Sequence, residues 1–309
     1  MHTQNSIVQK LQFERLQARN IRVLVKRDDF IHEEISGNKW RKLKYNLELC
    51  RVRKKNGILT FGGAYSNHLV ATAAACKEQN LQCIGLVRGE ELHVDTNTTL
   101  QRCAELGMEL RFISREEYAM RNDSAYHETL AADFPSFQRV PEGGANYYGM
   151  IGCQEILKEV DEPVNHLFVA QGTTTTSCGI MLSLQAHQTL HVVPVLKGFE
   201  AKEEMLALFA KSGMEASLIE DLLNQVEVHD AYHFGGYGKY TTELLDFIRS
   251  IYTEQQLKLD PIYTGKAFYA MLQELESHRF DNSTVLFVHT GGLQGAKGIE
   301  EKSGTKLFV

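Results

Sequence analysis

Short apolar runs alternate along the chain with longer polar stretches of helical character, and this alternation predicts the secondary structure. The apolar runs, where we expect strands, lie at 21–25, 57–61, 83–87, 109–113, 166–170, 191–195 and 284–289. The clearest helical stretches lie between them, at 67–78, 98–106, 179–188 and 202–210. Strands that alternate with helices predict an α/β fold in which helices cover both faces of a mainly parallel sheet.

Several expected strands end in turns rich in glycine and hydroxyl residues. Ligands of open α/β sheets bind outside the carboxyl ends of the strands, so these turns are where chemistry is expected. The turn GGAYSNH at 62–68 precedes an alanine-rich helix. Ser66 can cap that helix and relay a proton, and Asn67 can hydrogen-bond a ring hydroxyl. A cap that serves only the helix explains this turn equally well.

A second turn, AQGTTTTSCG at 170–179, places one glycine and five consecutive hydroxyl residues before an apolar helix. Backbone N–H groups, hydroxyl donors and a helix dipole together suit a phosphate group. The turn matches neither Gly-x-x-x-x-Gly-Lys-Ser/Thr nor Gly-x-Gly-x-x-Gly. It therefore argues against a P-loop nucleotide hydrolase and weakens a dinucleotide-binding interpretation.

Three further turns carry tyrosine, threonine or paired glycines, namely FGGYG at 234–238, DPIYTGKA at 260–267 and HTGGLQG at 289–295. Tyr263 can stack on a ring or move a proton, and Thr264 can hydrogen-bond a ring nitrogen. Tyrosines that only pack are common at turns, so this structural alternative stays open.

The segment ISGNKWRKL at 35–43 places Lys39 directly after a Ser-Gly-Asn turn and before a basic, helical run. A lysine held in this way can form a Schiff base with an aldehyde cofactor, and Lys42 can approach the phosphate of that cofactor. Taken alone, the segment is more typical of a solvated lysine at a helix start.

Composition narrows the class of protein further. The chain has 309 residues and a formal net charge of −6, so it is long enough for two domains and lacks the basic surface expected of a nucleic-acid-binding protein. It contains no apolar run of the ~20 residues that span a membrane, and residues 1–19 lack the apolar region of a secretory signal. The six cysteines form no Cys-x-x-Cys pair, which favours buried thiols in a reducing cytoplasm over a metal site or disulfide framework.

Taken together and in order, these segments resemble the 1-aminocyclopropane-1-carboxylate deaminase and D-cysteine desulfhydrase family. The resemblance runs from Lys26 to Gly295 and depends on four motifs in combination: SGNKxRKL, GGxxSNH, DPxYxGK and HTGG. It implies a pyridoxal 5'-phosphate enzyme with the tryptophan-synthase-β type of fold, in which the cofactor lies in the cleft between two open α/β domains. It also implies a large domain of residues 1–42 and 151–309, a small domain of residues 43–150, and a homodimer.

The resemblance assigns roles to individual residues. Lys39 is implied as the lysine bound to the cofactor, Asn67 as the partner of its phenolic oxygen, and Thr264 as the neighbour of its pyridine nitrogen, with Thr290 also at the cofactor. The implied phosphate site consists of Lys42, Gly172, Thr173, Thr174, Thr175 and Thr176. The implied substrate carboxylate site consists of Ser66, Asn67 and His68, and the two implied active-site tyrosines are Tyr237 and Tyr263.

The chain departs from its family at two positions that bear on the site. The phosphate loop usually has a second glycine where this chain has Thr174 or Thr175, and many relatives have glutamine in place of Tyr65. The chain is also shorter than many relatives. These departures affect the expected phosphate contacts and the shape of the substrate pocket.

Two threonines favour one reaction of the family over the other. Deaminases typically read Tyr-Glu-Gly-Lys and His-Leu-Gly-Gly, whereas this chain has Thr264 and Thr290 at the corresponding positions. A neutral Thr264 does not keep the pyridine nitrogen protonated as a carboxylate does, so loss of the α-proton should be followed promptly by β-elimination. We therefore expect elimination from a small β-substituted amino acid, D-cysteine first, to pyruvate, sulfide and ammonia. The alternatives are 1-aminocyclopropane-1-carboxylate deamination and cofactor binding without turnover.

Overall fold

The protein consists of two compact units in a computed structural model that describes residues 6–35, 37–304 and 306–308. The larger unit combines the chain up to Asn38 with the chain from Cys153 onward, and the smaller unit is Lys39–Gly152. The expected limits had assigned residues 39–42 and 151–152 to the larger domain. These residues group instead with the smaller unit; the helix α2 (Asn38–Val52) continues through 39–42 without a break.

The larger unit contains a sheet with the strand order β1-β2-β10-β7-β8-β9. Its strands are β1 (Val8–Leu11), β2 (Arg22–Lys26), β7 (His166–Gln171), β8 (Thr189–Pro194), β9 (Val226–Val228) and β10 (Thr284–Val288). Only β1 pairs antiparallel among the described strands; the others pair in parallel. The residues of β10 are all buried, as expected for a parallel strand covered on both faces.

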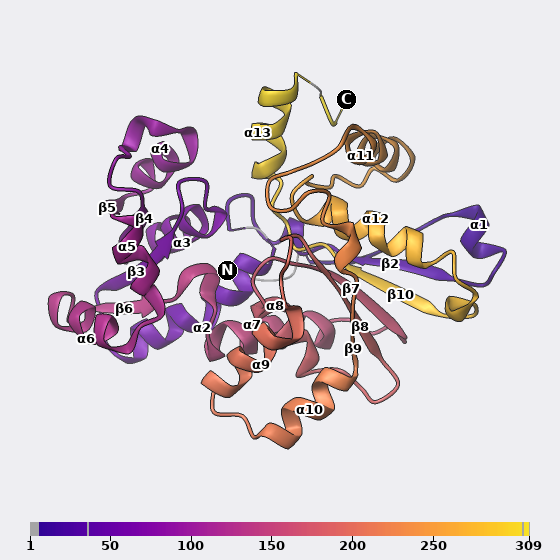
Figure 1. The fold of residues 1–309 in the computed structure, drawn as a ribbon, viewed down its shortest axis with the longest axis horizontal. Helices are drawn as coiled ribbons and strands as arrows, with labels where there is room; N and C mark the ends of the chain where they lie inside the picture. The colour runs from indigo at the N-terminus through magenta and orange to yellow at the C-terminus, as the bar shows by residue number, and fades with distance from the viewer. Residues whose placement is uncertain (1–5, 36, 305, 309) are drawn as a thin grey trace. The chain divides into compact units, whose positions relative to one another are not determined.

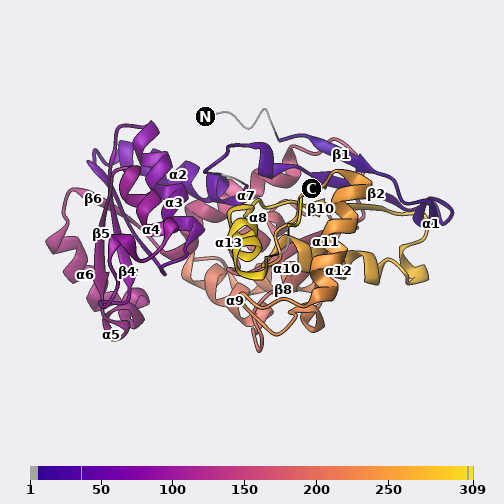
Figure 2. The ribbon, with the colours of Figure 1, turned by 90° about the horizontal axis from the view of Figure 1, so that it is seen from above.

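Helices of the larger unit follow the strands and pack on the sheet. They are α1 (Glu14–Gln17), α8 (Thr175–Met181), α9 (Ala201–Lys211), α10 (Ala216–Asn224), α11 (Thr242–Gln255), α12 (Thr264–Glu274) and α13 (Gln294–Ser303), with α7 (Tyr147–Lys158) crossing the limit between the units. Figures 1 and 2 both show α11 beside α12, and α12 lies over β7 and β8. Phe168, Val193 and Phe268 belong to the apolar core between these helices and the sheet.

The smaller unit has its own fully parallel sheet, in the order β5-β4-β3-β6 (Figure 1). Its strands are β3 (Gly57–Gly62), β4 (Gln82–Arg88), β5 (Met108–Ile113) and β6 (Phe137–Val140). Its helices, besides α2, are α3 (Asn67–Glu78), α4 (Thr98–Glu105), α5 (Arg115–Ala119) and α6 (Ser124–Asp133). Phe61 and Tyr118 pack edge to face in its core. The expected α/β fold with two mainly parallel sheets is confirmed.

The expected helix at 179–188 was wrong in its limits. The helix α8 begins at Thr175 within the threonine run and ends at Met181. The chain then turns, because the side-chain oxygen of Gln188 accepts from the backbone N–H of Gln185 and the N–H of Gln188 donates to the carbonyl of Gln185. The six cysteines are all buried, as expected. Within the described ranges, no helix is long and apolar enough to cross a membrane.

Candidate active site

The residues just before Lys39 are fixed to two predicted site segments. Gly37 has φ +63°, and a Cβ there would lie 1.9 Å from the carbonyl oxygen of Thr290, so only glycine fits this approach. The Asn38 side-chain amide donates to Thr176 Oγ1 at 2.9 Å, and its backbone N–H donates to the carbonyl of Thr290 at 3.3 Å. Chain connectivity therefore places Lys39 directly after this anchored pair. Ser36 of the same motif lies outside the described residues.

The threonine run follows β7 and is largely buried. Thr174, Thr175 and Thr176 are buried, whereas Thr173 is exposed. Thr175 Oγ1 has no hydrogen-bond partner among the described residues, although it is shielded from solvent. Thr174 has φ −72° and ψ −12°, an ordinary helical conformation, so replacing the family's usual second glycine with threonine causes no backbone strain here.

Gln171, directly before this run, is a second buried polar group without a partner. Its side chain is fully buried at the end of β7, and neither its amide nitrogen nor its oxygen has a hydrogen-bond partner among the described residues. An unsatisfied buried amide costs free energy, so native proteins rarely leave one without a ligand or water. Gln171 and Thr175 are therefore buried polar groups whose missing hydrogen bonds a polar ligand could supply.

The start of α12 is, by contrast, fully hydrogen-bonded. The buried carboxylate of Asp260 accepts from the backbone N–H groups of Ile262, Tyr263 and Thr264 at 2.8–2.9 Å. The Thr264 hydroxyl donates to the same carboxylate at 2.6 Å and accepts from the Asp260 N–H at 2.9 Å. This arrangement fixes the backbone that carries Tyr263 and the orientation of the Thr264 hydroxyl.

The two predicted tyrosines meet in the larger unit. The rings of Tyr237 and Tyr263 lie 6.1 Å apart with an edge-to-face geometry. Tyr263 also lies against Gly172, because a Cβ at that glycine would come within 2.6 Å of the tyrosine ring. Lys266, in the first turn of α12, donates to the carbonyls of His233 and Gly236 at 2.8 Å and so holds the turn that carries Tyr237. Burial lowers the pKa of Lys266 to about 8.

The remaining predicted residues lie in the smaller unit. Ser66 caps α3, its side chain accepting from the N–H of Leu69, and Asn67 is the first residue of that helix. His68 is buried, and burial, with the nearby charges of Lys42 and Lys39, lowers its pKa to about 3. These contacts bring together the residues predicted on α2 and α3.

The hydrogen bonds of His68 define which ring nitrogen carries its hydrogen. Thr60 donates its only hydroxyl hydrogen to the carbonyl of Val140, so it accepts from His68 Nε2 at 3.0 Å. The buried Nδ1 is then a lone pair without a partner among the described residues. That atom suits an N–H or O–H group of a ligand rather than the carboxylate that the resemblance implies for this turn.

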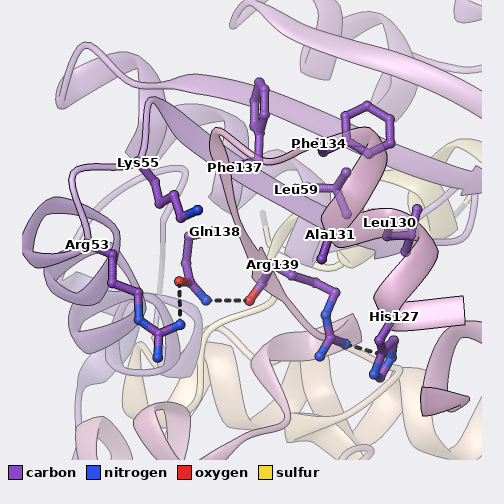
Figure 3. Close-up of a pocket in the computed structure, with 10 residues that line it drawn as sticks. All are labelled: Arg53, Lys55, Leu59, His127, Leu130, Ala131, Phe134, Phe137, Gln138 and Arg139. Atoms are coloured by element: carbon purple, nitrogen blue, oxygen red, sulfur yellow. Dashed lines mark hydrogen bonds between the residues drawn. The ribbon is translucent and has the colours of Figure 1, made fainter. Parts of the chain in front are cut away.

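A pocket in the smaller unit lies away from the predicted residues. It has a volume of about 240 Å³ and is lined by Arg53, Lys55, Leu59, His127, Leu130, Ala131, Phe134, Phe137, Gln138 and Arg139 (Figure 3). Its polar groups already contact one another: Arg53 donates to the Gln138 side chain, and Arg139 lies 2.7 Å from His127 Nε2. None of the described residues that line it is a predicted site residue.

Sequence comparison identifies the family. Residues 5–291 match the family described as pyridoxal-phosphate dependent enzyme. The chain belongs to this family. The predicted cofactor, pyridoxal phosphate, and the predicted enzyme class are thereby confirmed.

Individual relatives of this pyridoxal-phosphate enzyme carry the two expected family names. A putative 1-aminocyclopropane-1-carboxylate deaminase of Pyrococcus furiosus is 32% identical over 288 residues, covering 88% of this chain and 85% of the relative. A mitochondrial bifunctional D-cysteine desulfhydrase/1-aminocyclopropane-1-carboxylate deaminase of Arabidopsis thaliana is 29% identical, covering 88% of this chain and 72% of the relative. A crystal structure of an ACC deaminase homologue superposes with a TM-score of 0.74 at 26% identity, over 97% of this chain and 93% of that one.

The threonine run fits the phosphate of this cofactor. Thr175 presents a buried hydroxyl whose hydrogen has no acceptor among the described residues, and phosphate oxygens are strong acceptors. Thr176 is already positioned by Asn38, next to the lysine expected to bind the cofactor. The donor set is therefore suited to the group that the family requires.

Four residues that shape this site were not predicted from the sequence: Asn38, Gln171, Asp260 and Lys266. Asp260 had a detectable signal, since Asp followed by Pro is typical of the start of a turn. The contact of Lys266 with residues 30 and more positions earlier had none, because it depends on tertiary packing.

Proposed function

We propose that this enzyme catalyses α,β-elimination on a small β-substituted amino acid, with D-cysteine as the first candidate substrate and pyruvate, sulfide and ammonia as products. The observation that carries this proposal is the buried hydroxyl of Thr264 at the start of α12. The neighbouring Asp260 carboxylate is occupied by three backbone N–H groups and by Thr264 itself. The side chain proposed to face the cofactor ring nitrogen is therefore an uncharged hydroxyl, whose hydrogen is held by Asp260 and which offers the ring a lone pair in place of a carboxylate.

Four groups of residues are proposed to hold the cofactor and to move the α-proton. When bound, pyridoxal phosphate delocalises the negative charge that develops at the substrate Cα. Lys39 Nζ would hold the cofactor aldehyde and, once the substrate amine has displaced it, would take the α-proton as a free amine. The threonine run with Lys42 would hold the phosphate. Asn67 orients the ring through its phenolic oxygen.

Three further residues, Ser66, Tyr237 and Tyr263, are proposed to hold and protonate the substrate. Ser66 and the first turn of α3 bind the substrate carboxylate, since the start of a helix offers unpaired N–H groups. Tyr237 and Tyr263 are the groups proposed to hold or donate a proton at the leaving sulfur, and their edge-to-face contact supports a shared role.

A substrate panel tests the proposal directly. We expect sulfide and pyruvate from D-cysteine, less product from L-cysteine and D-serine, and no 2-oxobutanoate from 1-aminocyclopropane-1-carboxylate. Lys39→Ala should abolish turnover and the visible absorbance of the bound cofactor. Lys44→Ala, on the same helix α2, is the matched control and should keep both.

The second candidate is deamination of 1-aminocyclopropane-1-carboxylate, which the names of the Pyrococcus and Arabidopsis relatives favour. Formation of 2-oxobutanoate without sulfide would replace the preferred reaction with this one. A cofactor spectrum that no amino acid in the panel changes would instead indicate a binding protein without turnover. Retention of the spectrum in Lys39→Ala would contradict the role of that lysine.

The assembly and location of the enzyme are part of the same proposal. We propose a cytoplasmic homodimer, on the basis of the family resemblance. Light scattering of the purified holoenzyme at micromolar concentration should give twice the mass of the 35.0 kDa chain. A monomeric mass would remove the dimer from the proposal without affecting the reaction.

A further inference from the structure

A histidine cluster lies on the sheet of the larger unit, at the opposite end of α12 from Thr264. We define it as His191, Glu227 and His229, and among the described residues it is the group whose ligand atoms gather within 4.8 Å of one another. His191 and Glu227 are register partners on β8 and β9, and His229 follows Glu227 by two residues. Side chains at positions i and i+2 of a strand share a face, so β pairing itself brings the three together.

We propose that the histidine cluster binds one divalent transition-metal ion, with Zn²⁺ as the reference ion. Two imidazole nitrogens and one carboxylate oxygen are a ligand set that Zn²⁺ accepts, with a fourth position left for water. Glu227 is 42% exposed while His191 is fully buried, so the site is open to solvent on one side. No part of the proposed reaction uses these residues.

The distances within the cluster are close to those of a tetrahedral site. His191 Nδ1 lies 2.9 Å from His229 Nε2 and 3.5 Å from Glu227 Oε2. Ligand atoms bound tetrahedrally to zinc at about 2.0–2.1 Å stand about 3.3 Å apart. The ligand atoms of His229 and Glu227 lie within 4.8 Å of each other, so movement of the half-exposed Glu227 side chain would close the site around the ion.

Both histidines have a partner on the nitrogen that faces away from the ion. His229 Nδ1 lies 3.3 Å from Glu274 Oε1, and that oxygen also accepts from the Tyr232 hydroxyl at 2.9 Å. His191 Nε2 lies 3.1 Å from His166 Nδ1. Metal-binding histidines almost always have such a partner, because it fixes the tautomer and the ring orientation.

The protonation of the cluster is compatible with a metal. Both rings are buried or nearly so, which favours the neutral imidazole that a metal requires. Without an ion, a hydrogen links His191 Nδ1 and His229 Nε2. The ion takes the place of that hydrogen, while His191 carries its hydrogen on Nε2 and donates it to His166.

The positive charge of Arg279 lies next to the histidine cluster and should weaken the binding of a cation there. Its guanidinium lies 2.7 Å from Glu227 Oε2 and 3.6 Å from Glu274 Oε2. A fixed positive charge next to the site weakens cation binding, and its removal frees the carboxylate of Glu227. Replacing Arg279 should therefore tighten metal binding.

Metal titration of the holoenzyme tests this inference. After removal of metals with EDTA, CoCl₂ should bind at one equivalent and give the visible absorption of tetrahedral cobalt, and ZnCl₂ should displace it. Zinc at a hundredfold excess over its Kd should raise the Tm by about 4 °C. Absence of one-equivalent binding, or a near-ultraviolet sulfur-to-cobalt band that indicates a cysteine site, would overturn the proposal.

Variants locate the ion. His229→Gln and Glu227→Gln should weaken Zn²⁺ binding at least 100-fold, and Glu274→Gln about 10–100-fold through its effect on His229. Arg279→Gln should tighten it about tenfold. His278→Gln removes an exposed histidine next to Arg279 and should change nothing, which makes it the matched control. Equal affinity in His229→Gln, Glu227→Gln and wild type would show adventitious binding; the half-exposed Glu227 keeps this test available should His229→Gln not fold.

Discussion

The starts of α8 and α12 both carry predicted cofactor residues, but their polar groups are in opposite states. At α12, Asp260 and Thr264 satisfy each other and three backbone N–H groups. At α8, the hydroxyl of Thr175 and the amide of Gln171 are buried without a partner among the described residues. The two helix starts thus differ in whether the protein alone completes their hydrogen bonds.

This difference distinguishes residues that fix the local fold from residues that bind a ligand. A complete network such as that of Asp260 stabilises the fold without any ligand, so its removal should lower the free energy of unfolding. An incomplete one is destabilising until a ligand supplies the missing contacts, so its removal should mainly reduce ligand affinity. The comparison therefore predicts opposite responses to substitution at two neighbouring helix starts.

Replacing Asp260 should have the largest effect on stability. Asp260→Ala leaves three N–H groups and the Thr264 hydroxyl without their acceptor, and we expect a loss of about 4 kcal/mol in the free energy of unfolding. Urea unfolding of the cofactor-free protein, followed by circular dichroism, measures it. The matched control is Thr241→Ala, which removes the ordinary cap of α11 and should cost about 1 kcal/mol. Similar losses in the two variants would contradict the special role of Asp260.

The unpaired nitrogen of His68 extends the comparison to the smaller unit. Its pKa is lowered from 6.5 to about 3, so the folded state disfavours the proton that the unfolded chain accepts below pH 6.5. Stability is therefore present above pH 6.5 and is lost as the pH falls toward 3, by about 3 kcal/mol at pH 4. Unfolding curves between pH 7 and pH 4 should show this loss in the free energy of unfolding. In His68→Gln the loss over the same pH range should be smaller by about 3 kcal/mol. An unchanged pH dependence in the variant would exclude His68 as the cause.

The sequence predicted most of the fold because the buried parallel strands are mostly apolar. The run at 284–288, for example, has no polar interruption after its first residue and forms the strand β10. The edge strand β1 (Val8–Leu11) was missed, since its two central residues, Gln9 and Lys10, are polar and give a weak signal. The start of α8 was placed too late because threonine has a low intrinsic helix propensity, which burial overrides here.

The candidate site was predictable as a set of motifs but not as a network. The contacts of Tyr237 with Tyr263 and of Asn38 with Thr176 join segments far apart in sequence, and only the fold reveals them. The histidine cluster gave no sequence signal, because its spacing depends on the pairing of β8 with β9.

Gly172 precedes α8 and lies against Tyr263 at the start of α12, so a substitution there tests how closely the two helix starts pack. A Cβ at this position would come within 2.6 Å of the Tyr263 ring, so Gly172→Ala should displace that ring or the turn and cost about 2 kcal/mol. The loss should show in urea unfolding, and the cofactor spectrum should shift because Tyr263 moves. Gly213→Ala is the control for replacing a glycine without a steric clash. Its added Cβ meets no atom within 4 Å, so any loss of stability arises only from its φ of +80°. An unchanged cofactor spectrum in Gly172→Ala would show that Tyr263 does not contact the cofactor.

Thr175→Val should have the smallest effect on stability. It replaces a buried hydroxyl that lacks a partner by a methyl group of the same shape, so the cofactor-free protein should unfold within about 1 kcal/mol of wild type or become slightly more stable. Its affinity for pyridoxal phosphate, measured by fluorescence titration, should nevertheless fall at least tenfold, because the phosphate loses a donor. Thr176→Val is the comparison variant, since it also removes the bond to Asn38 and should lose both stability and affinity. Wild-type affinity in Thr175→Val would show that an unsatisfied hydroxyl does not mark the phosphate site, and the contrast between α8 and α12 would then concern folding alone.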